Sequence, residues 1–104
     1  MTTPADRCRA DVWLWRARFF KTRNLAAAAL NAGAVRLGRA GAIRRAEAAT
    51  FLRAGDELAF AALDGKVRLV RVVALGERRG PVAEAHTLYE EFQSPLDDGG
   101  EAVS

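Results

Sequence analysis

The chain contains one cysteine and one histidine, and this scarcity excludes several kinds of site. Cys8 has no partner for an internal disulfide, which suits a reducing compartment. With His86 as the sole imidazole, neither a usual zinc ligand set nor a Cys-His nucleophile pair is available. We therefore expect no catalytic residue, no metal, no cofactor and no small-molecule substrate, and we expect a cytoplasmic protein.

Long hydrophobic runs are also missing. Half of the 104 residues are hydrophobic, but no run approaches the roughly 18–20 apolar residues that cross a membrane. The opening MTTPADRCRAD lacks an apolar core followed by a small-residue cleavage site, so it does not indicate a secretory signal. No internal repeat or long linker divides the sequence, which predicts one domain with a modest core and no membrane partner.

Acidic residues are scarce at the start of the chain, and basic residues are missing at its end. Residues 1–45 carry ten basic and two acidic side chains, whereas no Lys or Arg follows Arg79. Fourteen of the sixteen basic residues are arginine, which makes forked contacts to phosphate and stacks on bases. A GC-rich coding sequence would also favour arginine, but it would not cluster the charge. The asymmetry predicts a basic face directed at an anionic partner.

Hydrophobic periodicity predicts a first helix over residues 9–20. Its apolar side chains fall on two nearly opposite stripes, so we expect the helix to lie between other elements. Trp13 belongs to the stripe that we expect in the core. The stripe with Trp15 is either covered by the last helix or partly exposed.

The second predicted helix, over residues 23–32, begins between two positive charges. Thr22 is a favourable N-cap and Gly33 a favourable stop. A helix N-terminus prefers acidic residues, so Lys21 and Arg23 cost roughly a few tenths to 1 kcal/mol there. This cost suggests that something negative from outside the chain belongs at this point.

Short strand-like pieces follow the second helix. Residues 55–75 predict a β-hairpin, with a tight turn at residues 64–65 and a bulge at residues 69–70. A last helix is predicted over residues 81–92, with His86 in a structural role near its apolar face. The order predicts an α+β fold, in which two N-terminal helices precede a small twisted β-sheet and a C-terminal helix.

The ends of the chain differ in composition from the middle. We expect a flexible arm over residues 1–8 and a folded domain over residues 9–93. Residues 94–104, SPLDDGGEAVS, are polar, acidic and rich in glycine, which predicts a disordered acidic tail.

Two basic clusters flank the second predicted helix and supply the candidate binding residues. The amides of a helix N-terminus and flanking cations suit a phosphate, and glycines in the second cluster let a partner approach the backbone. Thr22 either caps its helix or donates to a phosphate oxygen, and the basic side chains are otherwise a solvated surface. The first cluster contains Arg9, Arg16, Lys21, Thr22 and Arg23, and the second contains Arg36, Arg39, Arg44 and Arg45.

Residues 9–38 resemble the RNA-binding domain named after ribosomal protein S-four, whose core, the αL motif, is two helices followed by a β-turn. That family typically reads Arg-Leu-Asp at the start, Ser-Arg at the second helix, then Gly-x-Val-x-Val-Asn-Gly and later Gly-Asp. The matching positions are Arg9 and Asp11, Thr22-Arg23, Gly33 to Leu37, and Gly55-Asp56. Asp11 is expected to pair with a nearby arginine and orient it.

Two longer stretches narrow the resemblance. WLWRARFFKTR and ERRGPVAEAHTLYEE resemble a stand-alone, ribosome-associated heat-shock branch of the family, and the likeness covers roughly residues 9–92. The sequence departs from the pattern at Gly38-Arg39, where Asn-Gly is usual. It also has a short acidic tail where that branch carries a long basic extension.

The resemblance implies a non-catalytic protein that binds structured ribosomal RNA on the large ribosomal subunit. It implies a role in recycling stalled ribosomes that hold peptidyl-transfer RNA, or in the heat-shock response. The implied RNA contacts are Arg9, Lys21, Thr22, Arg23, Arg36, Arg39, Arg44 and Arg45; Arg78 and Arg79 either extend that surface or do not belong to it.

Two other classes of function compete with this one. A protein-interaction module would use the same basic face to dock an acidic partner. An RNA-modifying enzyme would need a separate catalytic domain, for which 104 residues leave no room.

Overall fold

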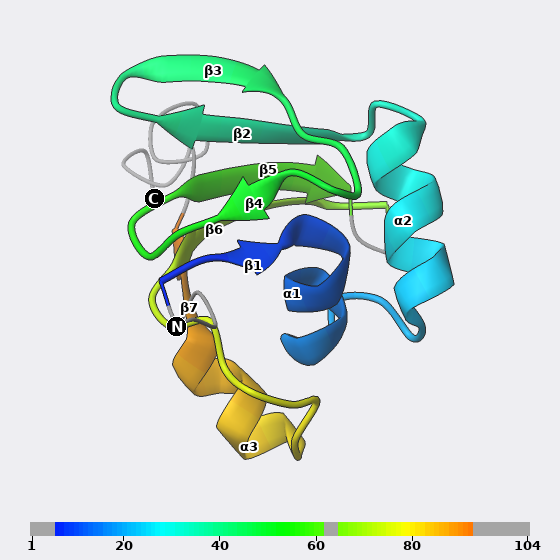
Figure 1. The fold of residues 1–104 in the computed structure, drawn as a ribbon, viewed down its shortest axis with the longest axis vertical. Coiled ribbons are helices and arrows are strands. Elements are labelled where there is room, and N and C mark those ends of the chain that lie inside the picture. The colour runs from blue at the N-terminus through cyan, green and yellow to red at the C-terminus, as the bar shows by residue number, and fades with distance from the viewer. Residues whose placement is uncertain (1–5, 62–64, 93–104) are drawn as a thin grey trace, which may run out of the picture.

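The computed structural model describes residues 6–61 and 65–92 of the chain. It has an α+β fold in which two helices precede an antiparallel sheet (Figure 1), and this confirms the predicted fold class. The elements in chain order are β1 (Cys8–Arg9), α1 (Ala10–Arg16), α2 (Arg23–Asn31), β2 (Val35–Arg39), β3 (Ala42–Arg45), β4 (Phe51–Leu52), β5 (Glu57–Ala61), β6 (Val67–Val72), α3 (Val82–Ala85), the 3-10 helix η1 (His86–Leu88) and β7 (Tyr89–Phe92). The predicted acidic tail over residues 94–104 lies outside the described residues, as do residues 1–5 of the predicted arm.

Five strands form one antiparallel sheet in the order β3-β2-β5-β6-β7. Strands β5 and β6 pair residue for residue, which confirms the hairpin, and the bulge predicted at residues 69–70 is absent from these described pairs. The tight turn predicted at residues 64–65 includes a position outside the described residues. No bulge is needed because Leu69 is half-buried on one face while Val70 is buried on the other. Strand β1 pairs with β4 separately, through Cys8 opposite Leu52.

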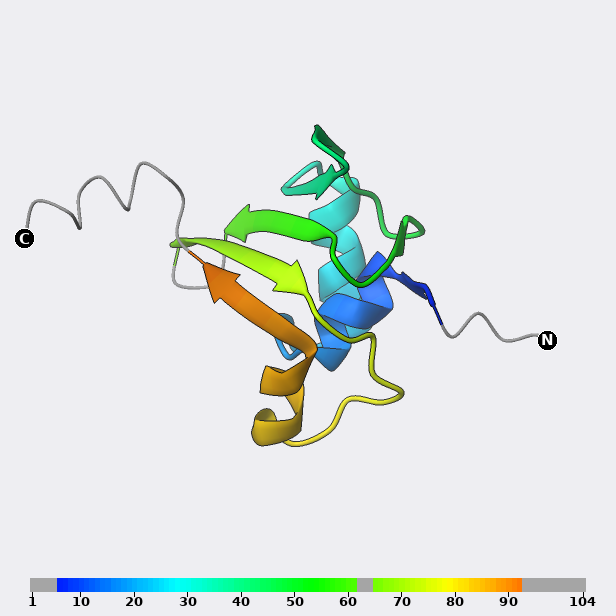
Figure 2. The ribbon, with the colours of Figure 1, turned by 90° about the vertical axis from the view of Figure 1, so that its left-hand side faces the viewer.

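Helices α1 and α2 pack together on one side of the twisted sheet, and α3 lies where β7 begins (Figure 2). Alternate residues of the strands point into the core that these helices cover, namely Val35, Leu37, Leu58, Phe60, Val70 and Val72. Trp13 is fully buried and donates its indole N–H to the carbonyl oxygen of Ala74 at 2.9 Å, which confirms its predicted place in the core. Trp15 is half-buried.

Helix α2 begins and ends as its sequence predicts. The hydroxyl oxygen of Thr22 accepts a hydrogen bond from the Leu25 N–H at 3.0 Å. At the other end, Gly33 has a φ of 84° and its N–H donates to the carbonyl of Leu30. The next N–H donates to the carbonyl of Ala29, which completes a Schellman motif.

Helix α1 is shorter than the predicted helix over residues 9–20 and ends in the same motif without a glycine. Arg18 takes the left-handed position with a φ of 67°, and its N–H donates to the carbonyl of Trp15. The Phe19 N–H donates to the carbonyl of Leu14, and the Phe19 ring lies 6.2 Å from that of Trp13. A residue with a Cβ costs roughly 1–2 kcal/mol more than glycine in this conformation, so Arg18 is held there by its surroundings.

The helix predicted over residues 81–92 is wrong beyond its first turns. Helix α3 ends at Ala85, and after η1 the chain becomes extended at Tyr89. Strand β7 satisfies the backbone groups along the edge of β6, and opposite charges meet across the two strands. These ion pairs join Arg71 with Glu90 and Arg68 with Glu91.

Candidate nucleic-acid interface

The first basic cluster lies where α1 passes into α2. Lys21, Thr22 and Arg23 are all exposed, and the first turn of α2 contains no acidic residue. Because the backbone N–H groups of this turn point out of the helix, they add partial positive charge to that of the two side chains. The arrangement suits a phosphate group.

Only part of the second basic cluster lies at the opposite end of α2, because Arg39 stands at the far end of β2 and contacts Phe51 and Asp56. Arg36 on β2 is directly opposite Arg45 on β3, so the two side chains share one face of the sheet. Arg45 donates from Nη2 to the carbonyl oxygen of Asn31, the last residue of α2, at 2.8 Å. Arg44 is exposed on the other face, because neighbouring residues of a strand alternate.

Helix α2 connects the two clusters. Its nine residues span about 14 Å along the axis. Asn24, Ala28 and Asn31 are exposed and follow one another at helical spacing, so they form an uncharged stripe from one cluster to the other. The structure therefore supports the expectation that one short helix joins both clusters for the residues at its ends, but not for Arg16 and Arg39.

Two of the predicted contacts are engaged with carboxylates of the chain. Arg9 donates from Nε and Nη2 to the two oxygens of Asp11 at 3.1 and 3.0 Å, which confirms that Asp11 pairs with an arginine. Arg39 makes the same forked contact to Asp56 at 2.8 and 2.7 Å. In each case the hydrogen bond to the carboxylate raises the pKa of the guanidinium, so part of the hydrogen-bonding capacity of both arginines is already used.

Arg16 does not join the first cluster at the surface. Its Nη1 donates to the carbonyl oxygen of Gly76 at 2.8 Å and approaches the sulfur of Cys8 at 3.5 Å. Arg78 is exposed and pairs with Glu84 at 2.7 Å, and this hydrogen bond lowers the pKa of the Glu84 carboxyl. Arg79 instead donates to a main-chain carbonyl.

The paired and unpaired arginines lie in different places. Arg68 and Arg71 of β6 and Arg78 before α3 are matched with glutamates. Across residues 6–61 and 65–92, no carboxylate pairs with the cations at the two ends of α2, which are Lys21, Arg23, Arg36 and Arg45. Arg44 also has no carboxylate partner among those residues.

Sequence reasoning missed Arg18, which is exposed beside Arg79 in the wall of a pocket. The one signal in the sequence was the lack of a glycine where the first helix had to end. In the part of the chain that the structure describes, no three His, Cys, Asp or Glu side chains are placed to hold a metal ion. Those same residues include no helix of the length and hydrophobicity that a membrane span requires.

Comparison with known proteins gives a consistent set of relatives. The chain is 38% identical over 92 residues to heat shock protein 15 of Escherichia coli K12, and 33% identical over 88 residues to a homologue from Haemophilus influenzae. These alignments cover 85% of this chain and 62–63% of the relatives' length. The homologue from Aeromonas salmonicida is 35% identical over 104 residues, covering 92% of this chain and 71% of its own.

The fold comparison agrees with the sequence comparison. A solved structure described as trimeric heat shock protein 15 of Vibrio cholerae superposes with a TM-score of 0.77 and 26% identity, covering 93% of both chains. No family model matches the sequence. The chain spans about three fifths of the length of the Escherichia coli relative.

Proposed function

This chain belongs to the heat shock protein 15 family, and from this we propose that it is a non-catalytic, cytoplasmic protein that binds structured RNA of the large ribosomal subunit. Its role would lie in the heat-shock response or in recycling stalled ribosomes. The family name supports an association with heat shock; RNA, the ribosome and peptidyl-transfer RNA are the partners that we propose.

The observation that supports this proposal most directly is the unpaired positive charge at both ends of α2. Arg36 and Arg45 lie directly opposite each other, and like charges in that relation are destabilising. Lys21 and Arg23 stand at a helix N-terminus, where cations are also unfavourable. An RNA backbone along α2 would relieve both costs at once, since its phosphates would lie beside each cluster.

The same geometry favours recognition of RNA shape over duplex sequence. The exposed stripe of α2 offers two polar side chains, Asn24 and Asn31, whereas recognition helices in a major groove present three or four base-reading side chains. Each phosphate neutralised by Lys or Arg adds to affinity and to its dependence on salt. We therefore expect binding to weaken steeply as salt rises.

The experiment is sedimentation of the tagged protein with purified ribosomal subunits, at low and moderate salt. We expect cosedimentation with large subunits, enriched when they retain peptidyl-transfer RNA, and a loss of at least tenfold in affinity for Arg23→Glu. Arg53→Glu makes the same charge reversal in the exposed loop after β4, at the end of the sheet away from α2 (Figure 1), and we expect it to bind normally.

The outcomes separate the competing functions. Binding to generic structured RNA without any preference for large subunits would leave an RNA-binding domain and remove the ribosomal role. Equal weakening by both variants would remove α2 as the interface. If no RNA binds and an acidic protein does, the interaction-module function takes first place.

A further inference from the structure

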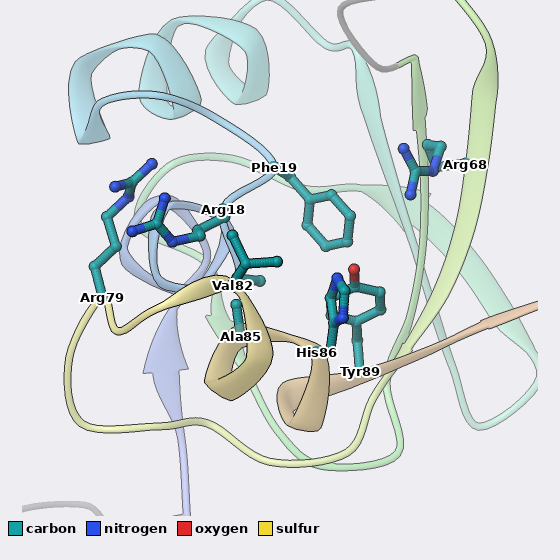
Figure 3. A pocket seen from close by; sticks show the side chains of 9 residues that line it. Arg18, Phe19, Arg68, Arg79, Val82, Ala85, His86 and Tyr89 are labelled. Atoms are coloured by element: carbon teal, nitrogen blue, oxygen red, sulfur yellow. The ribbon is translucent and has the colours of Figure 1, made fainter.

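A pocket lies beside the α1–α2 connection, which supplies Arg18 and Phe19 to its lining. It has a volume of about 260 Å³ and is formed by the end of α1, the segment before α3, α3 itself and the start of β7 (Figure 3). Cationic side chains and aromatic rings line it together. The lining side chains are Ala17, Arg18, Phe19, Arg68, Arg79, Val82, Ala85, His86 and Tyr89.

Arg18 and Arg79 are fixed by a reciprocal pair of hydrogen bonds. Arg18 donates from Nε to the carbonyl oxygen of Gly80 at 2.7 Å, and Arg79 donates from Nε to the carbonyl oxygen of Trp15 at 3.1 Å. Within the described part of the chain, neither guanidinium pairs with a carboxylate. Both therefore keep their charge and their terminal N–H donors while their stems are already ordered, which lowers the entropic cost of binding an anion.

The backbone of Arg18 gives an independent reason to assign it a role. It occupies the left-handed position that ends α1, where α2 uses Gly33. Residues in such strained conformations persist only where the surrounding structure enforces them, and they are concentrated at ligand sites. An arginine here places a cation at the rim of the pocket, which the glycine favoured by the backbone would not supply.

The opposite wall of the pocket is aromatic. The rings of Phe19 and Tyr89 lie 4.6 Å apart at 52°, and His86 meets Tyr89 edge-on at 6.1 Å. Val82 is 55% exposed beside them. Arg68 lies 5.5 Å above the Phe19 ring while it pairs with Glu91, so its charge is largely matched within the sheet. Figure 3 shows the arginines 18 and 79 on one side and the rings on the other.

We propose that this pocket binds one unpaired nucleotide of RNA, with its phosphate at Arg18 and Arg79 and its base against Val82, Phe19 and His86. Unpaired bases are recognised by stacking on aromatic side chains, and arginine forks suit the phosphate. The volume lies below the usual range for ligand pockets, which suits a single nucleotide rather than a longer segment.

The position of the pocket connects it to the interface on α2, and in this respect the inference rests on the proposed function. Phe19 lines the pocket, and Lys21 follows two residues later at the start of the first basic cluster. An RNA strand that extends from α2 past this connection would reach the mouth of the pocket. A bulged or splayed nucleotide at that point would enter it, while the neighbouring phosphates remain on α2.

The test is an NMR titration of the full, isotope-labelled chain with AMP, adenosine and inorganic phosphate in separate experiments. We expect AMP to shift the ring signals of His86 and Tyr89 with millimolar affinity. Arg79→Gln should weaken this binding at least fivefold. Arg78→Gln is the matched control, because the Arg78 guanidinium pairs with Glu84 and lies outside the pocket lining. This variant should bind AMP within twofold of the parent chain.

Arg18→Gly provides a second variant, because glycine fits the local backbone and keeps the chain folded. This variant should also weaken AMP binding at least fivefold. The proposal is overturned if adenosine binds as tightly as AMP, if phosphate alone reproduces the AMP affinity, if the ring signals do not move, or if both Arg78→Gln and Arg79→Gln act equally. None of these results needs a ribosome, so AMP binding with no sedimentation on subunits would overturn the proposed function alone. Normal sedimentation without AMP binding would overturn only the pocket.

Discussion

Arg39 on β2 and Asp56 just before β5 form a forked ion pair, with both carboxylate oxygens accepting hydrogen bonds from one guanidinium. The Asp56 side chain is only 4% exposed, whereas Arg39 is 36% exposed. Asp56 also accepts from the N–H of Arg53, and Arg39 donates to the carbonyl oxygen of Phe51. The pair therefore joins the loop between β4 and β5 to the last residue of β2.

Removing Arg39 should destabilise the fold. In Arg39→Ala the buried Asp56 carboxylate keeps the Arg53 N–H but loses its charged partner, at a cost of about 1–3 kcal/mol in the free energy of unfolding. Urea denaturation followed by tryptophan fluorescence measures this cost. Arg36→Ala is the matched control, since Arg36 is an exposed arginine of the same strand with no carboxylate partner among the described residues.

The same two variants separate structure from binding. Arg36→Ala should keep or slightly raise the urea midpoint, because it removes the like charge opposite Arg45, and it should weaken RNA binding. Arg39→Ala should do the reverse, provided that binding is measured where the variant is fully folded. A loss of RNA affinity in folded Arg39→Ala as large as that in Arg36→Ala would show that Arg39 contacts RNA as well as Asp56.

Features with local causes could be predicted from the sequence. The N-cap at Thr22 and the stop at Gly33 depend on residues within one helical turn, and both are confirmed. Helical periodicity places Trp13 on one apolar stripe with Ala10, Leu14 and Ala17, and all four are buried. The pairing of Asp11 could be predicted because its partner, Arg9, is only two residues away.

Features with distant causes could not be predicted in the same way. The apolar spacing of residues 82–92 fits a helix, but β7 instead completes the edge of β6 and pairs its glutamates with arginines about twenty residues earlier. The partner of Arg39 is seventeen residues away. Arg18 and Arg79 line one pocket although sixty-one positions separate them, and no local pattern in the sequence indicates that contact.

Cys8 should make the stability of the fold depend on pH above neutrality. Burial raises the pKa of its thiol above the ordinary value of 9.0, although Arg16 opposes the shift. Because the folded-state value is the higher one, the stabilisation is complete below about pH 9 and is lost as pH rises through the folded value. Between pH 8 and pH 10.5 the parent chain should therefore lose unfolding free energy relative to Cys8→Ala. A constant difference across that range would contradict the buried neutral thiol, as would rapid alkylation of the folded chain at pH 8.

Arg23 should contribute to RNA binding mainly through charge. If it neutralises one phosphate, Arg23→Gln should lower affinity and reduce the slope of log Kd against log salt by about 0.7–0.9. Filter binding of a structured ribosomal RNA fragment between 50 and 300 mM salt, roughly the range over which such slopes are resolved, measures both quantities. Arg71→Gln removes the same charge from a side chain that pairs with Glu57 and Glu90, and its slope should match that of the parent chain. An unchanged slope in Arg23→Gln would mean that no phosphate lies at the start of α2.

Thr22 allows helix capping and RNA binding to be changed in opposite directions. Aspartate is at least as good an N-cap as threonine, and its charge suits both the helix N-terminus and the neighbouring Lys21 and Arg23. Thr22→Asp should therefore keep or raise the urea midpoint, whereas Thr22→Ala should lower the free energy of unfolding by about 1 kcal/mol. If a phosphate binds at this turn, the new carboxylate would repel it, so the better-capped variant should bind RNA at least tenfold more weakly. Thr22→Ser keeps the hydroxyl and should preserve both properties. Tight RNA binding by Thr22→Asp would show that no RNA phosphate binds beside Lys21 and Arg23, because a carboxylate and a phosphate cannot share the same helix end.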